Sequence, residues 1–340
     1  MSIEYDEVDH RVSATDDAVH SDWDNSREPI RTVESGDVVE FECRDATNGQ
    51  IDPDSTVADL ADLDVGQVHT LTGPIAMEDA EPGDVLQVDV LDLEHQGWGY
   101  TLVLPGELGM GLLPEEFPEP ALHVWEFEDD AAHFVDSVAS ETQREDGSAE
   151  GGSVDGIEVP LHPFPGTVGV APAADGQHDT NPPRPVGGNL DIKQLTAGST
   201  LYLPIAVADA LFSIGDCHAA QGDGEVCISA IEAPMSVTCR LEVQPEMGLE
   251  RPQFETDGPF TPTGRDEPAF GTTGIGDDLS EAARDAVRGM IDHLHEERGL
   301  EREQAYVLCS AAVDLKINQI VNAPNWTVSA YLPESIFPEG

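Results

Sequence analysis

Residues 200–225 read TLYLPIAVADALFSIGDCHAAQGDGE, and the character of the chain changes inside this stretch. Residues 200–214 are mostly apolar, which is typical of buried strands. Residues 215–225 place carboxylates, a histidine and a glutamine among glycines. Polar groups that carry function are often held on loops by a rigid scaffold. The stretch therefore predicts a β protein with polar residues gathered where its strands end.

Short alternating runs closed by Gly-Asp turns continue this pattern elsewhere, as in VESGDVVEFECRDA (33–46), AEPGDVLQVDVLDLEHQG (80–97) and CISAIEAPMSVTCRLEV (227–243). Alternation of apolar and polar residues with a period of two indicates β-strands. Helical spacing of apolar residues appears only late, over 279–294 and 301–316, and the strand-like WTVSAYLP (326–333) follows. Strands first and helices late predict a mainly β fold with an α+β C-terminal portion.

The predicted domain organisation is a β-rich catalytic body over residues 1–250 and an α+β portion over residues 251–340 packed on it. Residues 251–277 are rich in Gly, Pro and Thr, and we interpret them as a long loop or linker. Residues 124–158 include SETQREDGSAEGGSVDG, which is too polar to bury enough surface to offset its ordering entropy. They are predicted to form an acidic surface insertion.

Charge is the strongest global signal, because 68 Asp and Glu oppose 15 Lys and Arg, for a formal net charge of -53. The acids are spread over the whole chain, so they would repel one another strongly at low salt. At molar salt the screening length falls to about 3 Å, and this repulsion largely disappears. We therefore expect a protein adapted to a salt-filled cytoplasm.

The composition also excludes some partners and compartments. Binding to nucleic acid or an anionic membrane requires cationic clusters, which the chain lacks. No apolar stretch approaches the ~18 residues of a membrane span. The five cysteines form no C-x-x-C pair, and no apolar signal region begins the chain. These features predict a cytoplasmic protein without disulfides, nucleic acid partners or membrane partners.

Candidate site residues lie in GGNLDI (187–192) and in GDCHAAQGDGE (215–225). In a strand, residues two apart project from the same face, so Asn189 pairs with Asp191 and Asp216 with His218. Carboxylates and an imidazole are ligands suited to zinc or a similar ion, and Glu225 is a further ligand or a general base. The spacing alone is equally consistent with ordinary turn residues beside a structural histidine.

His20 and Trp23, in HSDWDN (20–25), are weaker candidates. They could form a polar-aromatic wall of the site, although N-terminal packing explains them as easily. Cys217 lies between two site candidates but faces the opposite side of the strand, so we assign it to the core. The chain has no G-x-S-x-G elbow and no P-loop, so serine-based and phosphate-based chemistry lose support.

The chain resembles the acetamidase/formamidase family from about residue 20 to 337. The resemblance rests on HSDWDN (20–25), GPIAMEDAEPGDVLQVDVLDLE (73–94), PFPGTVGVAPA (163–173), PPRPVGGNLDIKQLTAGSTLYLPI (182–205), ALFSIGDCHAAQGDGEVC (210–227) and AYVLCSAAVDLKINQIVNAPNW (305–326). It implies a jelly-roll-like β-sandwich with a smaller β part and an α+β part. It also implies a homo-oligomer, a dimer or higher, that hydrolyses small amides such as formamide or acetamide to ammonia and a carboxylate.

The resemblance places Asn189, Asp191, Asp216, His218 and Glu225 at the site. We expect the two aspartates and His218 to bind a divalent metal, zinc first and calcium as an alternative. Such an ion can lower the pKa of water from 15.7 to about 7. Glu225, acting with His218, would move the proton from the water to the departing nitrogen.

Substrate contacts are expected from Asn189, Trp23 and His20.

Two alternatives to small-amide hydrolysis stay open. One is hydrolysis of another C–N compound, such as a urea-like, guanidine-like or aryl amide molecule. The other is a non-catalytic β-sandwich that binds a divalent ion. The sequence does not rank the preferred amide, the native metal, the number of ions or the number of subunits.

Overall fold

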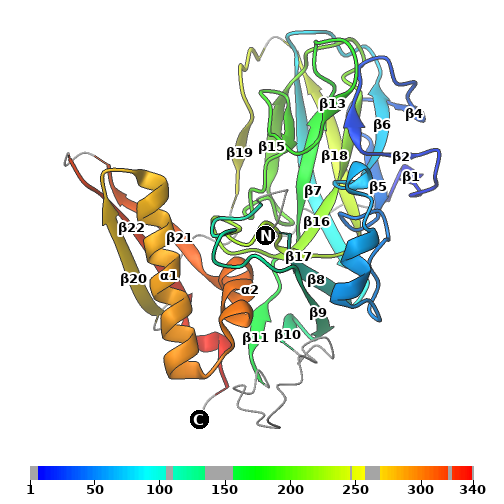
Figure 1. Cartoon of the computed structure of the whole chain (residues 1–340). Coiled ribbons are helices and arrows are strands. Elements are labelled where there is room, and N and C mark those ends of the chain that lie inside the picture. The colour runs from blue at the N-terminus through cyan, green and yellow to red at the C-terminus, as the bar shows by residue number, and fades with distance from the viewer. Residues whose placement is uncertain are drawn as a thin grey trace.

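The computed structural model describes residues 7–104, 110–134, 156–245, 247–256, 269–320 and 324–338. Two large β-sheets form the body, and a small sheet with two helices stands beside them (Figure 1). The predicted mainly β class with an α+β C-terminal portion is confirmed. No helix in the described parts of the chain is both long and apolar enough to span a bilayer.

The first large sheet has six strands, and its two longest strands lie side by side at its centre. The order is β1 (His10–Val12), β5 (Val38–Cys43), β18 (Met235–Gln244), β7 (Val85–His95), β15 (Thr200–Pro204) and β19 (Gln253–Glu255). Only β1 pairs in parallel, with β5. Since β19 extends this sheet, part of the stretch that we interpreted as a linker belongs to the body.

The second large sheet is organised around β16 (Phe212–Ala220), in which every residue is buried. Its main path is β11 (Glu158–Pro160), β10 (Ala131–Phe134), β9 (Ala121–Glu128), β8 (Trp98–Val103), β17 (Ile231–Glu232), β16, β12 (Phe164–Val170) and β14 (Gly187–Asn189). Strand β6 (Leu71–Met77) also pairs with β16, and β2 (Val19–His20) and β4 (Arg31–Val33) pair with β6. β3 (Asp22–Trp23) and β13 (His178–Asp179) form a separate two-stranded sheet.

The two large sheets share one apolar core. Phe41 of β5 meets Phe212 of β16 edge to face, with ring centroids 5.7 Å apart. Cys217 is fully buried in this core, as strand alternation predicts. Burial of such side chains is the main stabilising term of a sandwich, at about 25 cal/mol per Å² of apolar surface. The polar residues of β16, Asp216 and His218, therefore lie on a strand that is tightly packed in the core.

The C-terminal portion packs α1 (Leu279–Arg298) and α2 (Arg302–Ala312) with a three-stranded sheet of β20 (Ala269–Gly276), β22 (Trp326–Pro333) and β21 (Asp314–Gln319). Asp278 caps the start of α1 through the main-chain nitrogen of Glu281, and Gly299 ends it in a left-handed conformation. Short 3-10 turns lie at Val57–Asp62, Val65–Gln67 and Glu334–Ile336.

Two predicted boundaries in this portion are wrong. The second helix was expected to continue to residue 316, but it ends at Ala312 because the chain from Asp314 pairs with β22. Residues 251–277 were expected to be a loop, but β19 and β20 lie within them. In both cases a pairing with a strand elsewhere in the chain overrides the local pattern.

The predicted acidic insertion at 124–158 is wrong for its first part. Residues up to Phe134 belong to β9 and β10, and Trp125 packs on Phe134 with ring centroids 4.7 Å apart. Trp125 and Phe127 point inward while Glu126 and Glu128 are exposed, which is the alternation of a strand. The prediction missed it because it used the average composition of residues 124–158. Residues 135–155 of the expected insertion lie outside the described residues, and its last residues are again part of the body, since Ile157 is buried and Glu158 begins β11.

Candidate active site

Five ionisable side chains converge at one end of β16. They come from β16 itself (Asp216, His218), from the segment after β14 (Asp191), from the loop after β16 (Glu225) and from β17 (Glu232). They form two groups that share the histidine, Asp191–Asp216–His218 and His218–Glu225–Glu232. In each group the ligand atoms lie within 4.8 Å of one another. The structure thus brings together the four residues predicted as metal ligands or as acid and base, Asp191, Asp216, His218 and Glu225, and adds Glu232.

Sheet register explains why Glu232 belongs to this cluster. His218 of β16 lies directly opposite Glu232 of β17, so both side chains stand on the same face of the sheet. His218 Nε2 lies 3.2 Å from Glu232 Oε2 and 3.7 Å from Asp216 Oδ1. Sequence analysis missed Glu232 because its neighbours, AIEAP, carry no motif that points to a site.

The backbone at the cluster adopts an uncommon conformation. Asp191 (φ 48°), Asp216 (φ 51°) and Glu225 (φ 41°) are all left-handed, and so is the nearby His69 (φ 55°). Such conformations cost of order 1–3 kcal/mol for residues other than glycine, and they gather at functional sites. The prediction that Asp216 and His218 would point together is confirmed, but through a left-handed residue rather than a regular strand.

Asn189 reaches the cluster through a threonine. The hydroxyl oxygen of Thr167, on β12, lies 2.9 Å from Asn189 Oδ1 and 2.9 Å from Asp216 Oδ2. Thr167 is fully buried, and a hydroxyl has only one proton to donate. Thr167 thus lies between Asn189 and Asp216 and places Asn189 at the edge of the cluster.

Three carboxylates of the cluster resist ionisation. Burial raises the pKa of Asp191 to about 7, although the His218 charge opposes the change. Burial, together with the charge on Asp191, raises the pKa of Glu225 well above its usual value. Burial also raises the pKa of Glu232. Each shift has the same cause, since an anion loses its hydration when it leaves water.

Asp216 and His218 form the ionised pair within this group. Burial disfavours the Asp216 anion, but the charges of His69 and His218 and hydrogen bonds from His218 and Thr167 outweigh it and lower its pKa. Burial likewise disfavours the imidazolium of His218, yet Glu232 and Asp216 outweigh it and raise its pKa. His69 was missed in the sequence, where it stands in an ordinary turn before β6.

Two buried carboxylate oxygens are not satisfied by hydrogen bonds within the described residues, although His218 Nε2 forms an ion pair with one of them, Glu232 Oε2, at 3.2 Å. Asp191 Oδ1 and Glu232 Oε2 are buried and make no hydrogen bond there. An unpaired buried carboxylate is costly unless it is protonated or faces a cation. Carboxylate oxygens with one imidazole nitrogen suit zinc, and an oxygen-rich set also suits calcium. The residues present therefore fit a divalent cation.

Contacts from the C-terminal portion hold the loop that carries Glu225. The main-chain nitrogen of Gly222 donates to the Ser310 carbonyl of α2 at 2.7 Å, and that of Leu315 in β21 donates to the Asp223 carbonyl at 3.0 Å. The position of Glu225 thus depends on residues almost a hundred positions further along the chain.

A buried ion cluster joins the same loop to the Asp191 segment. Lys193 forms an ion pair with Asp314, and its Nζ lies 3.3 Å from Asp223 Oδ1. The Asp223 main-chain nitrogen also donates to Asp314 Oδ1 at 3.0 Å. Removing one partner of a buried ion pair leaves an uncompensated charge, so this arrangement makes the two segments that carry Asp191 and Glu225 interdependent.

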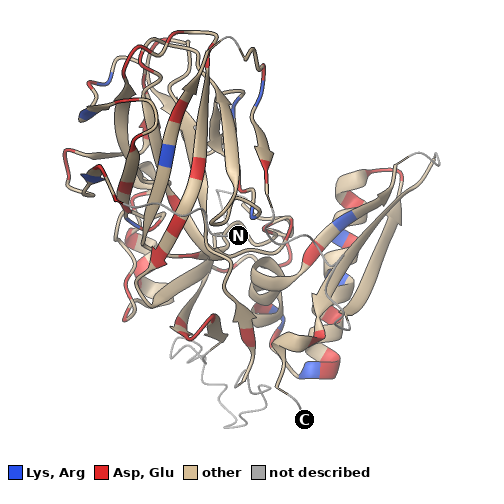
Figure 2. Ribbon diagram, turned by 180° about the vertical axis from the view of Figure 1, so that it is seen from behind, with Lys and Arg blue, Asp and Glu red and all other residues tan. Residues whose placement is uncertain are grey.

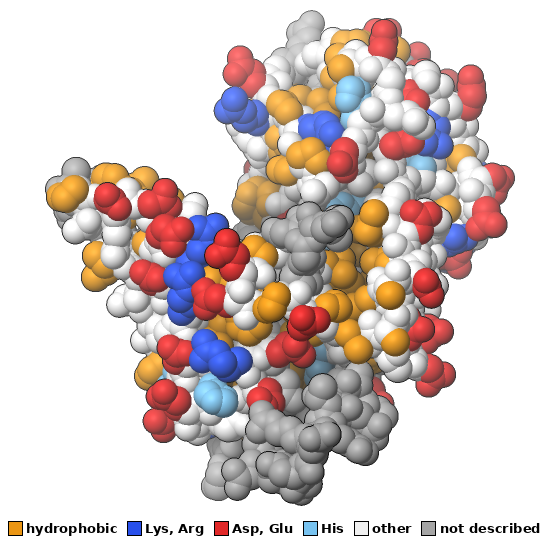
Figure 3. All heavy atoms as spheres, in the orientation of Figure 1, with side chains coloured by type: hydrophobic (Ala, Val, Ile, Leu, Met, Phe, Trp, Pro, Cys, Tyr) orange, Lys and Arg blue, Asp and Glu red, His pale blue; other side chains and the backbone are white. Residues whose placement is uncertain are grey.

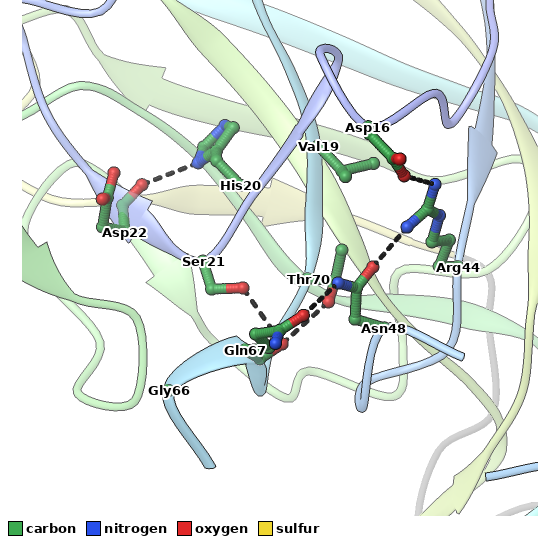
Figure 4. Close-up of a pocket in the computed structure, with 10 residues that line it drawn as sticks. All are labelled: Asp16, Val19, His20, Ser21, Asp22, Arg44, Asn48, Gly66, Gln67 and Thr70. Carbon is green, nitrogen blue, oxygen red and sulfur yellow. Dashed lines mark hydrogen bonds and ion pairs between the residues drawn. The ribbon is translucent and has the colours of Figure 1, made fainter. Parts of the chain in front are cut away.

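His20 and Trp23 are placed beside this cluster but do not join it. His20 Nε2 lies 3.0 Å from Ser213 Oγ, and Nδ1 lies 2.7 Å from the Asp22 carbonyl. His20 lines a polar hollow of about 600 Å³ shown in Figure 4. Trp23 is 2% exposed and packs near Gly188. No hydrogen bond within the described residues links either side chain to the ligand groups, so their contact with substrate stays a prediction.

Comparisons with known proteins agree with this architecture. A model of the acetamidase/formamidase family matches residues 6–181 and 173–339. A formamidase from Methylophilus methylotrophus is 32% identical, over 97% of this chain and 92% of its own. An acetamidase from Mycolicibacterium smegmatis is 32% identical, over 88% and 87%. The structure of a gamma lactamase from Delftia acidovorans superposes with a TM-score of 0.83 at 26% identity, covering 97% and 94%.

Gly166 offers a test of how tightly the cluster is packed. A Cβ at this position would lie 2.6 Å from His218 Cε1, 2.7 Å from the Asp216 carbonyl and 2.9 Å from Asp191 Oδ1. We expect Gly166→Ala to displace these groups and to lower kcat by about 10²-fold, since misplacement of about 1 Å has costs of that size. Steady-state kinetics measure the change. The control is Gly276→Ala, where the nearest atom is 3.9 Å away. Equal kcat values for the two variants would contradict this account.

Proposed function

Because the chain belongs to the acetamidase/formamidase family, we propose that the cluster around His218 is its active centre and depends on a divalent metal. The protein is an amide hydrolase that cleaves the C–N bond of small amides such as formamide and acetamide. The products are ammonia and a carboxylate. Family membership favours an enzyme over a β-sandwich that merely binds an ion.

The observation that carries the metal proposal is the pair of buried oxygens without a hydrogen bond, Asp191 Oδ1 and Glu232 Oε2, in the two ligand groups that share His218. We propose Asp191, Asp216 and His218 as ligands, with Glu232 as a further one. A divalent cation held there would supply Lewis acidity, which makes water more acidic and polarises the amide carbonyl. Zinc is the proposed native metal, and calcium is the alternative.

Glu225 is the proposed general base and acid. It is half-buried, lies within reach of the His218 ligand group and sits on a loop that the C-terminal portion holds in place. A cation bound beside Glu225 would offset the like charges that help to raise its pKa, so that its carboxylate could take a proton from the attacking water as the C–O bond forms. It then gives that proton to the amide nitrogen as the C–N bond breaks, so ammonia leaves neutral. The amide of Asn189 is proposed to hydrogen-bond the substrate.

A second substrate class is favoured by one comparison. The superposed structure from Delftia acidovorans is named a gamma lactamase, and it covers nearly the whole chain. A lactam is a cyclic amide, and its cleavage needs the same attack on the carbonyl and the same proton for nitrogen. The ratios of kcat/KM for formamide, acetamide and a five-membered lactam would rank these substrates.

Removal of metal tests the proposed function. We expect treatment with a strong chelator to abolish ammonia release from formamide and acetamide, and added zinc to restore it, because the residues alone do not make water nucleophilic at neutral pH. Ammonia is measured in an enzymatic assay, and metal content is measured in the same samples. Continued turnover by protein shown to be metal-free would refute the proposal.

Substitution of Glu225 separates proton transfer from metal binding. Glu225→Gln keeps the shape of the side chain but cannot accept the proton, so we expect kcat to fall by about 10² to 10⁴-fold while bound zinc is retained. Glu126→Gln, at an exposed position of β9, is the matched control. If Glu225→Gln loses zinc instead, this residue is a ligand and the general base lies elsewhere.

We further propose that the protein is adapted to a salt-rich cytoplasm. Acidic residues are spread over the body and the C-terminal portion, as Figure 2 shows. In Figure 3 one group of basic side chains lies over α1 among acidic ones, and others are scattered over the body. Arg284, Arg288, Arg298 and Arg302 each pair with a carboxylate, which leaves them engaged rather than free for phosphate.

Salt dependence tests this adaptation. We expect loss of structure by circular dichroism when KCl falls below about 0.5 M, because screening of the carboxylates weakens as the Debye length grows. Full structure in dilute buffer would contradict the proposal.

Sedimentation in molar KCl tests the proposed homo-oligomer. We expect a particle of at least twice the mass of one chain, and a particle of 36.4 kDa would show that the protein is a monomer.

A further inference from the structure

Gln221 follows the last residue of β16 and is a buried polar side chain, 9% exposed. Its amide joins two segments of the site. The Nε2 atom donates to the main-chain carbonyl of Asp191 at 3.1 Å, and the Oε1 atom lies 3.0 Å from Nδ1 of His218. Both polar atoms of the Gln221 amide are engaged by these two contacts. These contacts therefore affect the relative positions of His218 and Asp191.

These two contacts fix the orientation of the Gln221 amide. The Asp191 carbonyl can only accept a hydrogen bond, so the amide nitrogen must face Asp191. The amide oxygen then faces the His218 ring, and since it also can only accept, Nδ1 of His218 must carry a proton and donate it. The remaining ring nitrogen, Nε2, is the one that lies 3.2 Å from Glu232 Oε2 and 3.7 Å from Asp216 Oδ1.

We propose that Gln221 is a positioning residue that keeps the proton of His218 on Nδ1 and directs Nε2 into the carboxylate cluster as a metal ligand. This inference rests on the proposed metal centre. By holding the Asp191 main chain as well, Gln221 also sets the distance between the two segments that supply Asp191 and His218. Partners of this kind behind a ligand contribute to metal affinity although they never touch the ion.

The choice of an amide rather than a carboxylate at this position has a physical reason. His218 already faces four carboxylates, those of Asp191, Asp216, Glu225 and Glu232. A fifth negative charge behind the ring would add repulsion to a buried acidic cluster. A neutral amide orients the ring through its oxygen without adding charge, and its nitrogen provides the donor that the Asp191 carbonyl needs.

The test compares zinc binding in Gln221→Met, Gln221→Glu and wild type, each full-length and stripped of metal. Methionine has a similar volume but makes neither hydrogen bond, so we expect zinc affinity, measured against a chromophoric chelator, to fall by about 10- to 100-fold. Glutamate still accepts from Nδ1, so its affinity should stay nearer to wild type. Gln244→Met is the control, because the side-chain amide of that glutamine donates to Gln87 near the far end of β18.

The second measurement is ¹⁵N NMR of histidine-labelled protein, with the His218 signals identified by their loss in His218→Asn. Wild type should show a protonated Nδ1 that exchanges slowly with water, and Gln221→Met should lose that protection. A folded Gln221→Met protein with wild-type zinc affinity and unchanged His218 signals would overturn the inference. If Gln221→Met does not fold, a loss of the Nδ1 proton signal in Gln221→Glu overturns it, and retention supports it.

The two proposals fail in different ways. If wild-type protein binds no zinc and no calcium, the metal centre is refuted. The NMR comparison then still shows whether Gln221 sets the proton and the direction of the His218 ring.

Discussion

Four carboxylates gathered around one imidazole, two of them buried and two half-buried, are the constraint on which the rest of this structure depends. Like charges repel strongly away from water, so Asp191, Asp216, Glu225 and Glu232 can stay together only if protons or a cation compensate them. The raised pKa values of three of them and the two oxygens without hydrogen bonds are two consequences of the same crowding. A group arranged in this way is poised to accept a divalent ion.

Holding such a group requires support from every direction. β16 carries Asp216 and His218 and is fixed in place, because all its residues are buried between neighbouring strands. Thr167 and Gln221 hydrogen-bond the ligand residues from two sides. The C-terminal portion closes the third side, where Ser310 and Asp314 hold the loop that carries Glu225. The α+β portion thus helps to position the cluster, although it contributes none of its five residues.

The surface and the site face the same electrostatic problem and meet it differently. Surface acids stay hydrated, and dissolved salt can screen their repulsion. The carboxylates of the cluster are shielded from bulk solvent, so screening reaches them poorly, and compensation must come from His218, His69 or a bound cation. A chain with a formal charge of -53 therefore still needs specific positive charges at its centre.

The sequence by itself determined the fold class and most of the ligand types. Alternation predicted the strands, helical spacing predicted a helix over 279–294, and the segments 187–192 and 215–225 supplied Asp191, Asp216, His218 and Glu225. These features are local, since they follow from side chains a few positions apart. Only the tertiary structure decided that Glu232, His69 and Gln221 belong to the site, that Trp125 lies in a strand and that α2 stops at Ala312. Each of these depends on sheet register, left-handed backbone or contact between distant segments, and none of those is encoded by the residues within a short window.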